Sequence, residues 1–343
     1  MRDPDPEDPD TSPHAVGGAA KFAYTRAQAQ GIDIDPLLRE AGLTRQQMED
    51  PDSRIRVESQ IRFLELAART LQDDYLGFHL GQNFDLRMIG LLYYVLASSD
   101  RLGEAMQRAA RYSTIVNEGF AMTFRAGKSI TIVLDYVGVA RHSDRQQIEF
   151  LMVTLLRLCR QLTGRRLSPT RVSFVHRRTD NSEFNAFFGC DVVFGAATDE
   201  VTFALPVAEM AVANADPYLN ELLIGYCEKA LATRPTPRSS FGHSVENAMA
   251  LLLPHGKARA SEVARQLGVS QRTLARRLAA EGLTFAGVLR SLRSDLANCH
   301  LTDEGLSISQ IAWMLGYQDV SAFTHAFKRW TGKAPRAARS ALQ

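Results

Sequence analysis

Two stretches near the C-terminal end of the sequence carry side chains suited to binding a polyanion. The first, SEVARQLGVSQRTLARRL (Ser261 to Leu278), holds three arginines within six positions. The second, SISQIAWMLGYQDVSAFTHAFKRWTGKAP (Ser307 to Pro335), ends in a basic, aromatic segment. Guanidinium groups pair with phosphate oxygens and, in bidentate geometry, with guanine. The chemistry that these residue types allow is nucleic-acid recognition.

The first stretch predicts a short helix, a turn and a second helix. We expect Ser261 to cap the first helix and Ser270 to cap the second, because a serine hydroxyl accepts a hydrogen bond from a free backbone N–H at a helix start. Gly268 supplies the left-handed turn, and Leu274 and Leu278 hold the second helix to a core. This leaves the following residues facing outward or sideways: Gln271, Arg272, Thr273, Ala275, Arg276 and Arg277.

The second stretch repeats this pattern. Ala312 and Gly316 repeat the spacing of four between Ala264 and Gly268 in the first stretch, and Phe323 and Phe327 take the places of Leu274 and Leu278. A helix over about residues 285–301 lies between the copies and could place the two outward faces in successive major-groove segments, about 34 Å apart. The outward residues of the second copy are Val320, Ser321, Thr324 and His325.

The distribution of charge supports this interpretation. The whole chain of 343 residues has a net charge of +2, but residues 238–343 carry 14 Lys and Arg against 7 Asp and Glu, hence +7, and the remainder carries −5. Two helical hairpins with exposed arginines would explain the pattern without DNA. A duplicated turn at matched spacing within a basic segment nevertheless favours DNA binding.

The chain is long enough for two domains. We predict an acidic, proline-rich disordered tail at 1–17, a mixed α+β domain at 18–232, a linker TRPTPRSS at 233–240, and an all-α domain at 241–343 with its helix-turn-helix motifs at about 261–280 and 308–331. Two prolines among small polar residues cannot hold a helix, which places the boundary at the linker.

Within the front domain, the apolar spacing predicts helices over about residues 56–71, 91–97, 144–162 and 217–232. Ser99-Asp100 is a candidate cap for a further helix whose apolar positions begin at Leu102. A hairpin is predicted between 120–124 and 129–136, and a second one between 190–194 and 200–205 across residues 195–199.

No catalytic or metal-binding motif stands out. The four cysteines form no CxxC pair, the scattered histidines suit structural roles, and neither GxSxG nor HExxH occurs. We therefore predict no enzyme activity, no cofactor and no metal. The N-terminus is the opposite of a secretory signal, and no apolar run reaches the roughly 20 residues that cross a bilayer. We expect a cytoplasmic protein that has no membrane contact.

The rear domain resembles the DNA-binding domain of the AraC/XylS family of bacterial transcription regulators. The resemblance rests on Ile308, Ile311, Ala312, Leu315-Gly316-Tyr317, Ser321 to Phe323, Phe327-Lys328-Arg329-Trp330, Gly332 and Pro335. It implies base contacts from the middle of each second helix. The predicted base-contacting residues are Gln271, Arg272, Thr273, Ala275, Arg276, Val320, Ser321, Thr324 and His325. Phosphate contacts are predicted for Ser270, Arg277, Lys328, Arg329 and Arg336.

The front domain is similar to the arabinose-binding-type N-terminal domain of one branch of that family. Residues 89–119, the FFGCDVVFGA segment and the DPYL at Asp216 carry this similarity, which implies no sugar for this chain. The resemblance predicts a regulator, an activator in our interpretation, that binds double-stranded promoter DNA and RNA polymerase, forms a homodimer and responds to a small effector of apolar character. Candidate pocket residues, which also suit a plain core, are Tyr93, Tyr94, Phe120, Phe124 and Tyr136.

Two alternatives stay open at this stage. The front domain could only dimerise, giving a constitutive regulator without a ligand. The helices over 102–118 and 217–232 are candidate dimer faces, although core packing explains such apolar stripes equally well. The chain could also be an enzyme fused to a DNA-targeting module, which would require a nucleophile or metal site in the front domain.

Overall fold

The computed structural model describes residues 12–137, 139, 144–232, 241–301 and 305–340. These residues form two compact units, an N-terminal one that ends at Ala232 and a C-terminal one from Phe241 to Ser340. The predicted linker and the first eleven residues of the predicted tail lie outside the described residues. Among the described helices, none is long and apolar enough to span a membrane.

The N-terminal unit is built on a five-stranded sheet in the order β3-β4-β7-β5-β6. Its strands are β3 (Phe120–Ala126), β4 (Ser129–Tyr136), β5 (Arg171–Phe174), β6 (Val192–Phe194) and β7 (Asp199–Ala204). The first hairpin is confirmed, because β3 pairs antiparallel with β4 from Phe120–Tyr136 to Ala126–Ile130.

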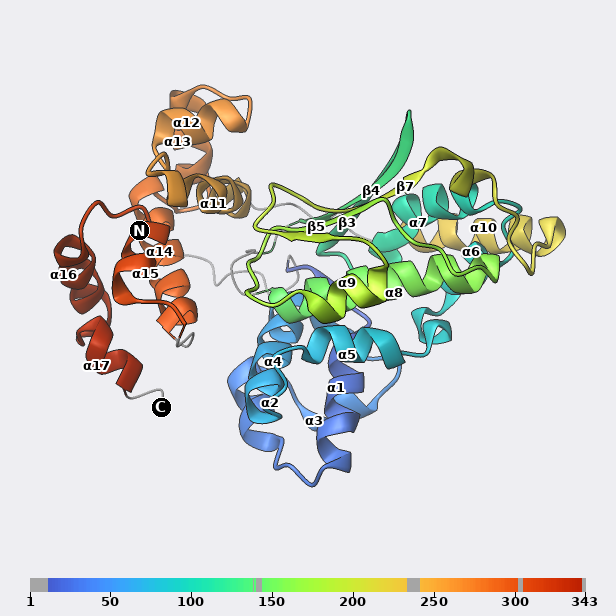
Figure 1. Ribbon diagram of the computed structural model, residues 1–343, viewed down its shortest axis with the longest axis horizontal. Helices are drawn as coiled ribbons and strands as arrows, with labels where there is room; N and C mark the ends of the chain where they lie inside the picture. The colour runs from blue at the N-terminus through green and yellow to red at the C-terminus, as the bar shows by residue number, and fades with distance from the viewer. Residues whose placement is uncertain (1–11, 138, 140–143, 233–240, 302–304, 341–343) are drawn as a thin grey trace, which may run out of the picture. The chain divides into compact units, whose positions relative to one another are not determined.

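Helices pack around this sheet and share one continuous core with it. They are α1 (Gly18–Ala29), α2 (Asp35–Ala41), α3 (Arg45–Glu49), α4 (Val57–Thr70), α5 (Leu76–Asn83), α6 (Leu91–Ala97), α7 (Leu102–Val116), α8 (Arg145–Thr163), α9 (Ser182–Phe188) and α10 (Pro217–Ala232), with short 3-10 turns η1 (Leu86–Ile89) and η2 (Leu205–Glu209). Figure 1 shows α8 running between the sheet and helices α4 and α5. The predicted helices over 56–71, 91–97, 144–162 and 217–232 are confirmed.

The close packing of α5 against α8 depends on a glycine. A Cβ on Gly77 would stand 1.9 Å from the carbonyl oxygen of Gln146, so only glycine fits at this crossing. The Gly77 amide donates to the Gln146 side-chain oxygen at 2.7 Å. Helix α8 is thus fixed at its N-terminal end. This helps to position the α8 side chains that follow, such as Phe150 and Thr154.

The second predicted hairpin is wrong. Strand β6 pairs in parallel with β5 through Val172–Val192, and β7 pairs antiparallel with both β4 and β5. Strand β5 therefore lies between the two strands that we expected to be neighbours. Both segments have strand-forming residues, but the local sequence does not reveal that an earlier strand inserts between them.

Two local predictions in this unit are also corrected. Helix α7 begins after Arg101 with no side-chain cap, and the Ser99 hydroxyl donates to the Val95 carbonyl instead. The Leu102 amide is satisfied by the Met210 carbonyl at 2.9 Å, so a tertiary contact replaces the cap. In the predicted tail, β1 (His14–Ala15) pairs with β2 (Ile55–Arg56), which orders the chain before residue 18.

The C-terminal unit is all-α. Its elements are α11 (Phe241–Leu252), the 3-10 turn η3 (Leu253–His255), α12 (Ala260–Gln266), α13 (Gln271–Ala280), α14 (Phe285–Leu301), α15 (Ile308–Met314), α16 (Val320–Thr331) and α17 (Pro335–Ser340). Two separate cores stabilise it. One gathers around Leu274 and Leu278, and the other around Phe323 and Phe327. The bounds of α14 match the predicted connecting helix.

Both turns and one of the two predicted caps of this unit follow the sequence prediction. Gly268 has φ +66° and Gly316 has φ +73°, in the left-handed region that favours glycine. The Ser270 hydroxyl accepts from the Thr273 amide at 3.1 Å and caps α13. Ser261 is not a cap, because α12 begins one residue earlier and Arg259 occupies the cap position without a side-chain bond.

Candidate functional site

Helix α13 presents a cationic face to solvent. Gln271, Arg272, Ala275 and Arg276 are exposed, while Leu274 and Leu278 on the opposite side are buried. Within the part of the chain that the structure describes, no carboxylate pairs with Arg272 or Arg276. An exposed guanidinium without an internal partner keeps all its donors for an external anion or base edge.

The three other predicted contacts of the first motif already have partners. The Thr273 and Ser270 hydroxyls lie 2.9 Å apart, and the Ser270 hydroxyl also caps the helix. The Arg277 guanidinium stacks 4.0 Å from the centroid of the Phe241 ring, a cation–π contact that draws α13 toward α11. Arg277 is nonetheless exposed. Its stacked position leaves Arg272 and Arg276 as the less constrained cations of the helix.

Helix α16 presents a different face. Val320, Ser321 and His325 are exposed and Thr324 is half-buried, so the middle of the helix carries no arginine or lysine. Its cations, the exposed Lys328 and Arg329, are in the last turn. The Asp319 side chain caps the helix by accepting from the Ala322 amide at 2.7 Å. Arg336, the last predicted phosphate contact, is exposed on α17.

One side chain on α14 fixes the second motif. Arg293 donates from Nε to the Leu315 carbonyl at 3.0 Å, and its guanidinium lies 4.6 Å from the Tyr317 ring centroid. A Cβ on Gly316 would stand 2.7 Å from the carbonyl oxygen of Leu253, which belongs to the first half. The turn of the second motif is therefore packed between α14 and η3.

A cavity of about 130 Å³ lies in the N-terminal unit. Its walls come from α1, α4, η1, α6, α7, α8, β3 and β4, with the segment before α1, and they are almost wholly apolar. Of the five predicted pocket residues, Phe120 lines this cavity and the other four are placed elsewhere. Tyr93 accepts a hydrogen bond from Gln161, Tyr94 is exposed, Tyr136 packs against Phe120, and Phe124 is half-buried.

The prediction missed the polar residues that line this cavity, among them Gln60 and Thr154. Both are buried, and each has an oxygen without a hydrogen-bond partner. A signal was present in the sequence. Gln60 stands four residues before Leu64 on the apolar face of α4, and Thr154 interrupts an apolar run of α8. A polar residue at a core-facing helical position requires a partner.

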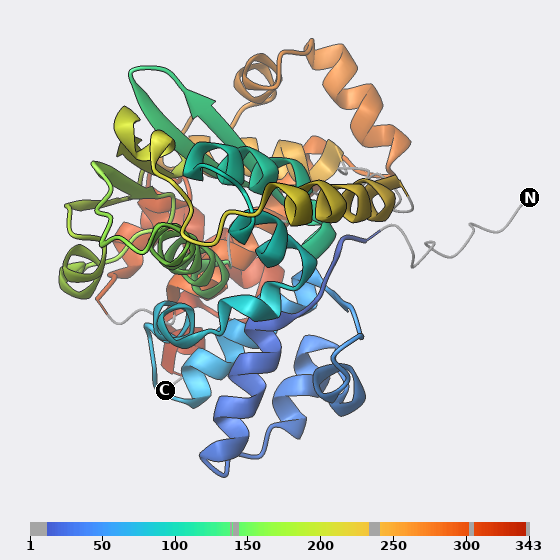
Figure 2. The ribbon, with the colours of Figure 1, turned by 90° about the vertical axis from the view of Figure 1, so that its right-hand side faces the viewer.

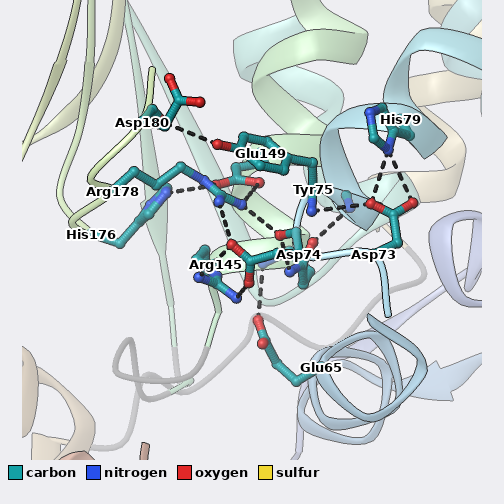
Figure 3. Close-up of polar contacts among 12 residues, drawn as sticks. Glu65, Asp73, Asp74, Tyr75, His79, Arg145, Glu149, His176, Arg178 and Asp180 are labelled. Atoms are coloured by element: carbon teal, nitrogen blue, oxygen red, sulfur yellow. Dashed lines mark hydrogen bonds and ion pairs between the residues drawn. The ribbon is translucent and has the colours of Figure 1, made fainter. Parts of the chain in front are cut away.

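A buried ion network secures the N-terminal end of α8 (Figure 3). The Glu149 carboxylate has no solvent exposure and accepts from Arg178 Nε at 2.5 Å and His176 Nε2 at 2.7 Å. Burial is the largest single influence and opposes its charge, but the hydrogen bonds and charge interactions with His176 and Arg178 together outweigh burial and lower the pKa of Glu149. Arg178 also donates to Asp74 at 2.8 Å and stacks 4.2 Å from the Tyr75 ring centroid. The network joins α8, the segment after β5 and the segment before α5, which is a structural role.

The two predicted dimer faces differ in their exposure to solvent: the face on α7 is buried and the face on α10 is exposed. The apolar positions of α7 are buried in the core of the unit. Helix α10, which lies on the surface that faces the viewer in Figure 2, exposes Tyr218 by 75%, Leu222 by 48% and Tyr226 by 61%, while Asn220 and Cys227 are its buried residues. Of these two described helices, α10 is the one that keeps an apolar stripe open to solvent.

Comparisons with known proteins agree with this arrangement. Residues 31–212 match the family model described as the arabinose-binding domain of AraC transcription regulator, N-terminal, and residues 263–341 match a helix-turn-helix domain. The ornithine utilization regulator of Pseudomonas aeruginosa is 28% identical over 327 residues, covering 89% of this chain and 93% of that protein.

Two further similarities cover nearly the whole length. The HTH-type transcriptional regulator VirS of Mycobacterium tuberculosis is 26% identical over 324 residues, covering 93% of this chain and 94% of that protein. The crystal structure of the transcriptional regulator CdpR from Pseudomonas aeruginosa covers 90% of this chain and 96% of that chain at 26% identity, with a TM-score of 0.45.

Proposed function

The chain belongs to the AraC family of transcription regulators, in the group with an arabinose-binding-type N-terminal domain, and from this premise we propose that α13 selects its DNA site while the N-terminal unit controls binding in response to a small molecule. It is a DNA-binding transcriptional regulator and not an enzyme. The residues that read DNA, the effector, the oligomeric state and the direction of control are our proposals.

The exposed, unpaired guanidinium of Arg276 carries the proposal for DNA reading. It stands in the middle of α13, the second helix of the first motif, where side chains of such helices reach base edges. A guanidinium can pair bidentately with guanine, and Arg272 stands one turn earlier on the same face. Ala275 between them offers at most a methyl contact to thymine. The middle of α16 would add contacts from Ser321, Thr324 and His325.

The remaining cations would position the protein. Arg277, Lys328, Arg329 and Arg336 are exposed and would contact phosphates, as would the hydroxyl of Ser270. Phosphate contacts fix the register of a protein on the duplex without reading sequence. The 17-residue helix α14 connects the two motifs and would hold them on successive major-groove segments.

Genome-wide footprinting with the full chain tests this proposal. We expect specific protected sites upstream of genes, each with two recognition elements about one helical turn apart. Arg276→Ala should weaken those footprints and reduce the preference for a particular base at one position of the DNA site. A protein that protects no specific site, under any growth condition, would contradict the proposed DNA-reading function.

Control by a small molecule is supported by the cavity in the N-terminal unit. An effector would shift the balance toward the arrangement that it binds more tightly, and DNA affinity would change with it. The rival is a constitutive regulator whose N-terminal unit only dimerises. A thermal-shift screen of small molecules separates the two, because a compound that raises the melting temperature and changes promoter binding supports control. If no compound does either, the constitutive regulator is favoured.

The open stripe on α10 supports a homodimer. Exposed tyrosine and leucine side chains on one helical face are typical of interface anchors. Light scattering after gel filtration should give twice the chain mass. Leu222→Asp should shift the protein to the monomer, whereas Leu205→Asp, at an exposed leucine outside α10, should not. A monomeric parent, or equal effects of the two changes, would contradict this face.

We further propose that the protein acts in the cytoplasm, where promoter DNA is found, and activates transcription by contacting RNA polymerase. Run-off transcription from a footprinted promoter tests the direction of control. More transcript in the presence of the protein is the expected result, and less transcript would make it a repressor.

A further inference from the structure

The cavity of the N-terminal unit has chemistry that restricts what it can hold. Its walls include Phe84, Leu92, Phe120, Leu134, Phe150 and Leu158. At about 130 Å³ it is close to the size of an apolar cavity of roughly 150 Å³ that accommodates a benzene ring. The space therefore suits one aromatic ring or a short alkyl chain, and no large ligand.

Two of the residues that line this apolar space have a buried oxygen without a partner. Gln60 is 3% exposed and donates its amide to Gln147 Oε1 at 2.8 Å, which leaves its own Oε1 free to accept. Thr154 is 7% exposed, and its hydroxyl has no partner. Buried polar atoms are nearly always hydrogen-bonded, and each exception costs stability. One acceptor and one hydroxyl together match a ligand group that both donates and accepts.

In the other polar lining residues the side-chain oxygen is already hydrogen-bonded. Gln147 Oε1 accepts from the Gln60 amide. Asn117 Oδ1 accepts from the Gly119 amide at 3.0 Å, and the Ser113 hydroxyl donates to the Ala110 carbonyl at 3.5 Å. A sugar needs partners for several hydroxyls, and among the described lining residues only Gln60 and Thr154 have a buried side-chain oxygen without a partner. The arabinose named by the family model does not suit it.

Charge restricts the ligand further. None of the described residues that line the cavity is a lysine, arginine, histidine, aspartate or glutamate. A carboxylate or phosphate buried here would lose its hydration without gaining an opposite charge, which is strongly unfavourable. Organic acids and phosphate esters are therefore excluded as ligands, even where the rest of the ligand is as apolar as the cavity.

We propose that the effector is an uncharged, mainly apolar molecule of about one ring in size with a single hydroxyl, which donates to Gln60 Oε1 and accepts from the Thr154 hydroxyl. This rests on the proposed control of DNA binding by the N-terminal unit. It defines the ligand class of that unit as neutral alcohols or phenols, distinct from sugars and acids.

The test measures heats of binding of three probes of one shape to the full chain. Benzyl alcohol should bind, toluene should bind about tenfold more weakly for want of the hydrogen bonds, and benzoate should not bind. Thr154→Val should bring benzyl alcohol close to toluene and leave toluene unchanged. Thr163→Val is the matched control, because Thr163 is also on α8 but does not line the cavity, and its hydroxyl already donates to the Cys159 carbonyl at 2.9 Å; it should change neither affinity.

A loss of binding in Thr154→Val would not be caused by unfolding of the variant. Thr154→Val removes a buried hydroxyl without a partner at nearly constant shape, so its melting temperature without ligand should equal or exceed that of the parent. Gln60→Leu provides a second variant, with the same loss of preference for the alcohol. Equal binding of benzoate and benzyl alcohol, or an unchanged preference in both variants, would overturn the proposal.

Failure of the proposed function gives a different result. If benzyl alcohol binds and depends on Thr154 but promoter affinity does not change, the ligand class stands and control of DNA binding fails. If a sugar or an acid changes promoter affinity while the neutral alcohol does not bind, control stands and the ligand class proposed here is wrong.

Discussion

The two helix-turn-helix motifs share one backbone plan but present different surfaces. Each has a left-handed glycine in its turn, a capped second helix and two large apolar anchors. On α13 the exposed middle carries Arg272 and Arg276, whereas α16 has cations only in its last turn. The anchors fix the fold, while the outward residues are free to differ. We infer that the first motif selects the site and the second mainly holds the protein on the duplex.

The two motifs also differ in how tightly their turns are packed. Gly316 lies against the Leu253 carbonyl and beside Arg293, while a Cβ on Gly268 would have no atom within 4 Å. The second turn is therefore a structural joint of the unit, and the first turn is an open surface turn. This agrees with a positioning role for the second motif.

The largest expected effect separates these two turns. Gly316→Ala adds left-handed strain and a clash with backbone, so it should lower the free energy of unfolding by about 3 kcal/mol or more. Gly268→Ala adds only the strain, for about 1–2 kcal/mol. Urea unfolding of the two variants measures both. Equal losses would mean that the Leu253 contact does not restrain the second turn.

A smaller effect compares the two helix caps. Asp319→Ala and Ser270→Ala each remove one cap bond and should cost about 1 kcal/mol. The aspartate should cost slightly more, since its charge also favours the helix N-terminus. Thermal unfolding with circular dichroism measures both. If Ser270→Ala cost clearly more than Asp319→Ala, Ser270 would have a role beyond capping.

The smallest effect concerns the cations of the second motif. Lys328→Ala should weaken binding by a similar factor on specific and random DNA, and should reduce the salt dependence of log K by about 1. Fluorescence anisotropy at several salt concentrations measures the slope. A loss confined to the specific site would give α16 a reading role and remove the proposed contrast between the motifs.

A structural feature could be predicted from the sequence where neighbouring residues alone determine it. Ser270, Gly268 and Gly316 mark their turns by residue type, and the bounds of α14 follow from its periodicity, so the C-terminal unit was predicted closely. The predicted cap at Ser99-Asp100 was wrong, because the Leu102 amide donates to the distant Met210 carbonyl instead.

Pairing of distant segments could not be predicted in the same way. Strands β6 and β7 resemble a hairpin in sequence, but β5 lies between them. The cavity likewise depends on helices and strands that are far apart in the chain. Gln60 and Thr154 are single polar residues on apolar faces, and only the fold brings them to one cavity. Sequence resemblance identified the family, while the ligand class required the structure.

The most direct test of the central claim compares Arg276→Ala with its neighbour Arg277→Ala on a footprinted site and on random DNA. Anisotropy titrations at fixed salt, with circular dichroism to confirm folding, provide the four affinities. Arg276→Ala should cost about 1–3 kcal/mol on the specific site, relax one base position and change random binding little. Arg277→Ala should weaken both DNAs alike. Equal loss on both DNAs for Arg276→Ala would contradict site selection by α13.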